Sequence, residues 1–272
     1  MPLGTHVVGV GYVYQSGEMY FDPLLQAEDV TLDMHALAGI YVQPVKLGNK
    51  LGRIDILLPH ATAGWEGWLS AEPTVKRCSG FADPRIRFSM NLIGPNAMGP
   101  KEILEYYSEH PVSTILGVSI AVTFPFGKYD ENKLLNIGQN RFIFRPQVGV
   151  VHNWGLWSYE LTGSIFIFTN NNRFYHNQLK EQKAIFVLLS HVIKRFRNKM
   201  WASVGGTYGL GGESIVEGLG LNDGYQDLLY SLSVSTPIGK TQAVKLVYMR
   251  WETQRSIGSA TNSLGVSWTK LF

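Results

Sequence analysis

The sequence predicts an all-β protein: a transmembrane antiparallel up-and-down β-barrel, formed by a single domain that covers residues 1–272. First, apolar and polar residues alternate in segment after segment of the chain. Second, the connections between these segments are alternately long and short. Third, charged residues make up only 17% of the chain, whereas soluble domains contain about 25%. The mean hydropathy of −0.02 agrees with this prediction, because alternating faces cancel in the average.

Period-two alternation indicates strands with one apolar face each. We expect about twelve strands, near 5–15, 30–43, 51–60, 81–92, 112–124, 142–152, 156–169, 183–196, 200–211, 225–235, 241–252 and 261–272. In a membrane barrel the apolar faces meet lipid and the polar faces line the lumen. On this rule Asp33 and His35, on the polar face of the segment 30–43, point into the lumen, as does His191.

The connections predict which end of the barrel is which. The turns at 153–155 and 197–199 are short, whereas the connections 61–80 and 125–141 are long. Outer-membrane barrels have short periplasmic turns and long extracellular loops. One short helix is expected at 101–110, between Pro100 and Pro111. It lies at the short-turn end, where we expect it to pack against the barrel rim.

A soluble β-sandwich would show the same alternation, so other features must favour the membrane. The predicted strands run to about 10–14 residues, whereas globular strands are usually nearer five or six. Closure into a barrel also removes the exposed edges of so large a sheet. Aromatic residues gather at strand ends, as belts at the lipid interfaces require: Trp157, Tyr159, Trp201, Tyr208, Tyr230, Trp251 and Trp268.

The C-terminal segment "NSLGVSWTKLF" (262–272) is an alternating strand that ends on an aromatic residue. With Trp268 and Phe272 it resembles the C-terminal signal by which the barrel-assembly machinery recognises bacterial outer-membrane proteins. Lys270 departs from that pattern, and its long side chain would snorkel to the interface. The resemblance implies that the assembly machinery is a partner of this chain.

Two internal stretches resemble one family of outer-membrane proteins. They are "FADPRIRFSMNL" (81–92) and "PFGKYDENKLLNIGQNRFIFRPQVGVVH" (125–152), of which residues 136–141 followed by "FRPQ" (144–147) are the most specific part. The family is named for the meta pathway of phenol degradation. The resemblance implies a small outer-membrane channel of bacteria that degrade aromatic compounds, and it brings no catalytic residues.

Other classes of protein are not supported by the residues. A net charge of +3 does not suggest a nucleic-acid partner. Ser190 and His191 are neighbours in a strand and therefore point to opposite faces, so they cannot form a catalytic relay. No spacing supports a metal site or a cofactor, and the one cysteine, Cys78, cannot form an internal disulfide. We expect a protein of the bacterial outer membrane; no signal peptide is visible, so we take it to have been removed.

These expectations describe a monomeric, passive channel for the uptake of small molecules such as aromatic or other biodegradation substrates. Its partners would be outer-membrane lipid and the small-molecule substrate. Two alternatives stay open: a structural or adhesive barrel with a blocked lumen, and a transporter of hydrophobic compounds with a lateral exit through the wall.

We expect the site to be the pore. The predicted pore-lining and selectivity residues are Arg85, Arg87, Arg145, Asp83, Glu160, His191 and Lys245. The loop 125–141 is expected to fold inward and constrict the lumen, with Tyr129, Asp130, Asn136, Asn140 and Arg141 as its main residues. The three arginines predict a preference for anions, unless lumen acids such as Asp83 and Glu160 neutralise them.

Overall fold

The structure is a computed structural model that describes residues 1–21 and 26–272. Its strands are β1 (Val7–Tyr20), β2 (Ala27–Leu47), β3 (Lys50–Leu69), β4 (Glu72–Phe81), β5 (Arg85–Ile93), β6 (Val112–Thr123), β7 (Ile143–Trp154), β8 (Trp157–Phe168), β9 (Asn171–Phe174), β10 (Gln178–Gln182), β11 (Ile185–Arg195), β12 (Trp201–Gly211), β13 (Ser214–Val216), β14 (Leu219–Gly220), β15 (Tyr225–Ile238), β16 (Gln242–Thr253) and β17 (Gly258–Leu271). The helix α1 spans Pro100–Glu109. In these described ranges, no helix is long and apolar enough to cross a membrane.

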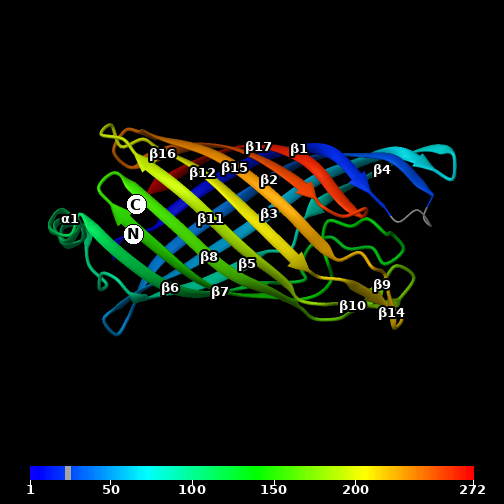
Figure 1. The fold of residues 1–272 in the computed structure, drawn as a ribbon, viewed down its shortest axis with the longest axis horizontal. Helices are drawn as coiled ribbons and strands as arrows, with labels where there is room; N and C mark the ends of the chain where they lie inside the picture. Colours follow the sequence, from blue (N-terminus) through cyan, green and yellow to red (C-terminus); the bar gives the residue numbers. More distant parts are fainter. Residues whose placement is uncertain (22–25) are drawn as a thin grey trace.

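The main sheet closes on itself to form the barrel (Figure 1). Within the described residues, twelve strands form the closed wall in the order β1, β2, β3, β5, β6, β7, β8, β11, β12, β15, β16 and β17, and β17 pairs with β1. The strand pairs of this wall are antiparallel throughout. The predicted up-and-down barrel of about twelve strands is therefore confirmed.

The extracellular end is more regular than the sequence predicted. The segment 61–80, expected to be a loop, is mostly strand: β3 continues to Leu69 and β4 returns beside it. Small residues in "HATAGWEG" (60–67) hide the alternation, because alanine and glycine give little contrast between faces. Four short strands, β9, β10, β13 and β14, form a second sheet at the same end of the barrel (Figure 1).

Both chain ends, the short turns and α1 lie at the opposite end (Figure 1). The helix begins at Pro100, where the Glu102 carboxylate accepts a hydrogen bond from the Gly99 N–H at 3.0 Å. It ends at Glu109, before Pro111, so its predicted position is confirmed within one residue. Tyr107 on this helix lines the lumen at its periplasmic mouth, as packing at the rim requires.

Large apolar side chains cover most of the outer wall. Exposed examples are Leu58, Ile86, Ile120, Val148, Leu161, Leu188, Val204, Leu232, Leu246 and Leu264. In water such a surface would be costly, whereas hydrocarbon solvates it. The period-two rule thus gives the correct faces for most of the wall.

Strand β2 is the exception, and its predicted orientation is wrong. Leu32 is buried on the inside, whereas Leu37 on the opposite face is 52% exposed. Asp33 and His35 therefore point outward, not into the lumen. Their polar groups are satisfied by the neighbouring strand, because Tyr14 donates a hydrogen bond to Asp33 at 2.6 Å and the Tyr12 hydroxyl contacts His35 Nδ1 at 2.6 Å.

The pairing of β17 with β1 continues one residue beyond both strands. The backbone of Phe272 exchanges two hydrogen bonds with His6, at 2.9 and 3.1 Å, and the two rings stack at 5.2 Å. Lys270 lies over the Phe272 ring at 4.6 Å. Further along the strand, the Trp268 indole N–H donates to Gln242 at 2.9 Å.

We expect deletion of Phe272 to lower the yield of folded protein in cells far more than it lowers the yield of purified protein refolded into vesicles. The deletion removes one pair of backbone hydrogen bonds and one ring contact, together worth about 1–3 kcal/mol. Heat-modifiable migration on gels measures the folded yield in cells, and refolding of purified protein into vesicles provides the control. Equal losses in cells and in vesicles would contradict a role for Phe272 as an assembly signal.

Candidate functional site: the lumen and its loop

The three predicted arginines lie together on the inner wall. Arg87 on β5 is directly opposite Ala121 on β6, and Ala121 is directly opposite Arg145 on β7. Arg85 lies two residues further along β5. Ala121 is 2% exposed, so its small side chain is covered where the long arginines project past it.

Their charges are balanced only in part. Asp55 accepts a hydrogen bond from Arg87 at 2.6 Å and one from Arg53 Nη2 at 3.2 Å, which leaves this trio with one net positive charge. Arg145 instead contacts the Ser164 hydroxyl at 3.1 Å and lies 4.4 Å above the Phe166 ring. In the described part of the chain, neither Arg85 nor Arg145 has a carboxylate within 4.0 Å. The carboxylate that pairs with Arg87 is Asp55, and neither Asp83 nor Glu160 pairs with these arginines.

Two more predicted lining residues, Glu160 and His191, lie with Arg145 around a lumen cavity of about 550 Å³. The His191 ring contacts the Ser231 hydroxyl at 3.2 Å and lies over Gly205, where a Cβ would be only 2.0 Å from it. Lys245 Nζ lies 5.5 Å above the Trp201 ring. In its periplasmic half the lumen therefore carries polar side chains of both charges on β8, β11 and β16.

Asp83 has a different role from the one expected. It lies between β4 and β5, and its two carboxylate oxygens accept the N–H groups of Gly127 and Gln139 at 2.8 and 2.7 Å. Both ends of the long loop are thus fastened to one side chain. A Cβ on Gly127 would lie 2.6 Å from the Asp83 carboxylate, and one on Gly138 would lie 2.9 Å from Gly127. Only glycine permits this close approach.

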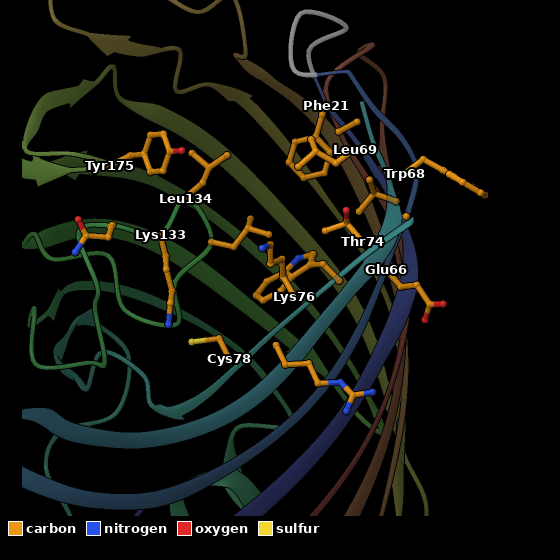
Figure 2. Close-up of a pocket in the computed structure, with 17 residues that line it drawn as sticks. Phe21, Glu66, Trp68, Leu69, Thr74, Lys76, Cys78, Lys133, Leu134 and Tyr175 are labelled. Atoms are coloured by element: carbon orange, nitrogen blue, oxygen red, sulfur yellow. The ribbon is translucent and has the colours of Figure 1, made fainter. Parts of the chain in front are cut away.

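The loop 124–142 runs along the inside of the barrel wall. The Lys128 N–H donates to the Phe81 carbonyl at 2.7 Å, and its side chain covers the inward face of Gly80. These contacts occupy part of the β4 edge that no neighbouring strand pairs with. Figure 2 shows Lys133 and Leu134 of this loop on the same side of the wall as Cys78.

The predicted loop residues hold the loop in shape. Asn136 accepts from the Asp130 N–H at 2.8 Å and donates to the Lys133 carbonyl at 2.8 Å. The Asn132 N–H donates to the Asp130 carboxylate at 3.0 Å, and this bond lowers the pKa of Asp130. Asp130 and Asn136 are thus occupied within the loop itself.

The other three residues fasten the loop to the second sheet. Buried Asn171 on β9 contacts Tyr129 and Asn140, both at 2.9 Å. Arg141 is buried, donates to Gln182 on β10 and lies 4.5 Å above the Phe168 ring. The five predicted residues are therefore a scaffold for the loop, and their effect on the pore would be indirect.

The reversed orientation of β2 gives the lumen an apolar wall. From the extracellular end to the periplasmic end, its inward residues are Leu32, Met34, Ala36, Ala38, Ile40 and Val42. The arginines project from another part of the wall, β5 to β7. A solute that passes along the barrel axis therefore meets an apolar surface and a cationic one.

A second cavity, of about 530 Å³, lies at the extracellular end between the loop and strands β2 to β4. We call it the outer pocket, and it is lined by Phe21, Ala27, Val30, Trp65, Lys76, Cys78, Leu134, Leu135 and Tyr175, among others. In Figure 2, Lys76, Cys78 and Leu134 face this space, whereas Glu66 and Trp68 point away from it. The sequence did not lead us to expect this pocket, although an apolar Leu–Leu pair inside a polar loop was a visible signal.

In residues 1–21 and 26–272, no group of three or more His, Cys, Asp or Glu side chains could hold a metal ion.

Comparisons with known proteins agree with this geometry. The sequence profile of the family described as "Putative MetA-pathway of phenol degradation" matches residues 9–262. The structure is similar to the COG4313 outer membrane channel from Pseudomonas putida F1, with a TM-score of 0.84 and 17% identity over 100% of this chain and 97% of that one.

More distant likenesses are to two autotransporter domains. The transport unit of AIDA-I from Escherichia coli has a TM-score of 0.50 and 8% identity, over 98% of this chain and 90% of that one. The beta domain of the Bordetella autotransporter BrkA has a TM-score of 0.50 and 7% identity, over 98% and 99%. No curated protein sequence matches the chain.

Proposed function

Because the chain belongs to the family described as "Putative MetA-pathway of phenol degradation", we propose that it is a passive channel of the bacterial outer membrane for small aromatic solutes, above all aromatic carboxylates. It works as a monomer in outer-membrane lipid after insertion by the barrel-assembly machinery. The fold is that of an outer-membrane channel, and the substrate class comes from the lumen.

The supporting observation is the pairing of an apolar wall with a cationic one. The inner face of β2 carries only apolar side chains from Leu32 to Val42, while Arg85 and Arg145 lack carboxylate partners among the described residues. An aromatic ring favours the first surface, and a carboxylate favours the second. A sugar or a metal cation would gain from neither.

Uptake into liposomes tests the proposal. We expect benzoate to enter protein-containing liposomes faster than a neutral sugar of similar size and faster than benzylammonium, an aromatic cation of similar size. Substituting Met34→Gln and Ala38→Ser together should reduce this preference for benzoate, because both changes make the apolar wall polar. Leu37→Gln is the matched control, since Leu37 lies on the same strand but faces outward. Equal rates for all three solutes would contradict the proposal, and no uptake at all would favour a structural barrel with a blocked lumen.

One observation favours a lateral exit as a second candidate function. The β7–β8 ladder keeps one register from Ile143 to Trp154 but lacks the pairs at Arg145 and Pro146, where proline has no N–H to donate. A groove of about 590 Å³ lies on the outer wall at this break, and the inward-facing residues Gln147 and Ser164 also line it. Arg145 covers the break from the inside through its contact with Ser164.

A disulfide across the break would distinguish a lateral exit through the wall from passage along the barrel axis. Pro146 and Ile165 are opposite each other across β7 and β8, so the variant Pro146→Cys, Ile165→Cys, Cys78→Ser can be cross-linked by oxidation. A lateral exit predicts that oxidation blocks the uptake of toluene and leaves benzoate uptake unchanged. Unchanged uptake of both solutes would exclude the lateral route and leave the axial one.

A further inference from the structure

We propose that the outer pocket is a binding site for aryl carboxylates, in which Trp65 receives the ring and Lys76 the carboxylate. This inference rests on the proposed function, because it names the place where the solute is first held. It goes beyond that function, since the pocket is separate from the lumen cavity and from the arginines.

The shape and lining of the pocket indicate a ligand of this kind. Its volume of about 530 Å³ is within the range of small-molecule sites, which are typically about 300–1,000 Å³ and mostly apolar. Val30, Trp65 and Cys78 line one side, and Leu134 and Tyr175 approach from the loop and the second sheet. The loop therefore contributes to the pocket.

The charge near this apolar surface is positive. Lys76 is directly opposite Trp65 in the β3–β4 ladder, so both side chains project from one place on the inner face. Lys76 has no carboxylate within 4.0 Å in the described part of the chain, whereas Lys133 is paired with Asp130 at 3.3 Å. The lining acid, Glu66, points away from the pocket (Figure 2). Arg77 also lines the pocket, but it lies on the opposite face of β4 from Lys76 and Cys78. Among the described residues, a carboxylate on the ligand would thus find the Lys76 ammonium available.

The register also places Cys78 close to such a ligand. Cys78 is two residues deeper along β4 than Lys76 and is directly opposite buried Ala63. A ring stacked on Trp65, with its carboxylate at Lys76, would occupy the pocket that Cys78 also lines. The ligand would then shield the thiol, and Cys78 is the one cysteine of the chain.

That arrangement provides a direct test. Full-length protein in lipid nanodiscs, which avoid detergent in the pocket, is treated with a small methanethiosulfonate that forms a mixed disulfide with Cys78 and releases methanesulfinate. We expect 4-phenylbutyrate to slow this reaction, and the neutral 4-phenylbutan-1-ol to slow it only at higher concentration. Calorimetric titration of the same nanodiscs with 4-phenylbutyrate measures the binding without the thiol.

Variants separate the two parts of the pocket. Lys76→Gln should weaken 4-phenylbutyrate binding by a factor of about three to five, as the loss of an exposed ion pair would, and leave phenylbutanol binding unchanged. Leu134→Asn should weaken both ligands. Lys240→Gln, in the β15–β16 turn at the far end of the barrel, makes the same change of charge and should alter neither.

The inference is overturned if 4-phenylbutyrate neither protects Cys78 nor binds by calorimetry. It is also overturned if Lys76→Gln binds the acid as tightly as the intact protein does. Either result combined with normal benzoate uptake would leave the proposed channel standing. Binding without any uptake would instead support the pocket and contradict the channel.

Discussion

Replacing Asp83 with alanine should increase the single-channel conductance in planar bilayers several-fold. The Asp83 carboxylate holds the N–H groups of Gly127 and Gln139 at once, so one side chain fastens both ends of the inward loop. A hydrogen bond to a charged group contributes about 1.5–3 kcal/mol. The loss of two such bonds would shift the loop from one dominant position to many, and the lumen that it occupies would open.

Two controls make this result specific. Asp83→Asn keeps one acceptor oxygen and should give an intermediate conductance with frequent transitions. Asp130→Ala removes contacts to Asn132 and Lys133 inside the loop but keeps both Asp83 anchors, so it should change conductance much less. Replacing residues 129–140 with a short Gly–Ser linker should give the largest conductance of all. If the linker variant conducts like the intact protein, the loop does not restrict the pore.

Most of the barrel could be predicted from the sequence, because a strand in lipid must alternate and a barrel must close. The failure at β2 has a physical reason. Alternation fixes which residues share a face, but not which of the two faces meets lipid. On β2 the more apolar face lines the lumen, so the rule that apolar faces point outward failed there. Tyr12 and Tyr14 were the available clue, since their hydroxyl groups on the outer face of β1 can satisfy His35 and Asp33.

The sequence predicted which charged side chains line the lumen, but not which groups they bind. The arginines alternate with outward residues, so their common face followed from the strand period. Asp83 could not be recognised as a loop anchor, because its partners are backbone N–H groups 44 and 56 residues away. Asp55 is a similar case in part: Arg53 lies two residues away on the same strand, but the bond to Arg87 depends on how β3 pairs with β5.

The pairings change what each arginine should contribute to ion selectivity. Arg87 shares Asp55 with Arg53, so the removal of its charge is partly offset. Arg85 and Arg145 have no such partner among the described residues, and they lie close together on the inner wall. We therefore expect the double variant Arg85→Glu, Arg145→Glu to convert an anion-preferring pore into a cation-preferring one.

The expected shift is large because two positive charges become two negative ones in a confined passage. A unit charge 4 Å from a monovalent ion changes its energy by about 1 kcal/mol in bulk water and by about 4 kcal/mol where the effective dielectric constant is near 20. Narrow walls of low dielectric strengthen this field further. Even the lower value exceeds thermal energy, so the reversal potential under a salt gradient should change sign.

Two further variants determine whether these side chains are the filter. Arg87→Gln should shift the reversal potential less than Arg145→Gln, because Asp55 then retains Arg53 as its partner. Lys240→Glu, in the β15–β16 turn outside the lumen, changes the total charge without changing the wall and should have little effect. Equal shifts from Arg87→Gln and Lys240→Glu, with no reversal in the double variant, would place the selectivity elsewhere. The most direct alternative would then be the loop, where Lys128 and Lys133 lie on the extracellular side.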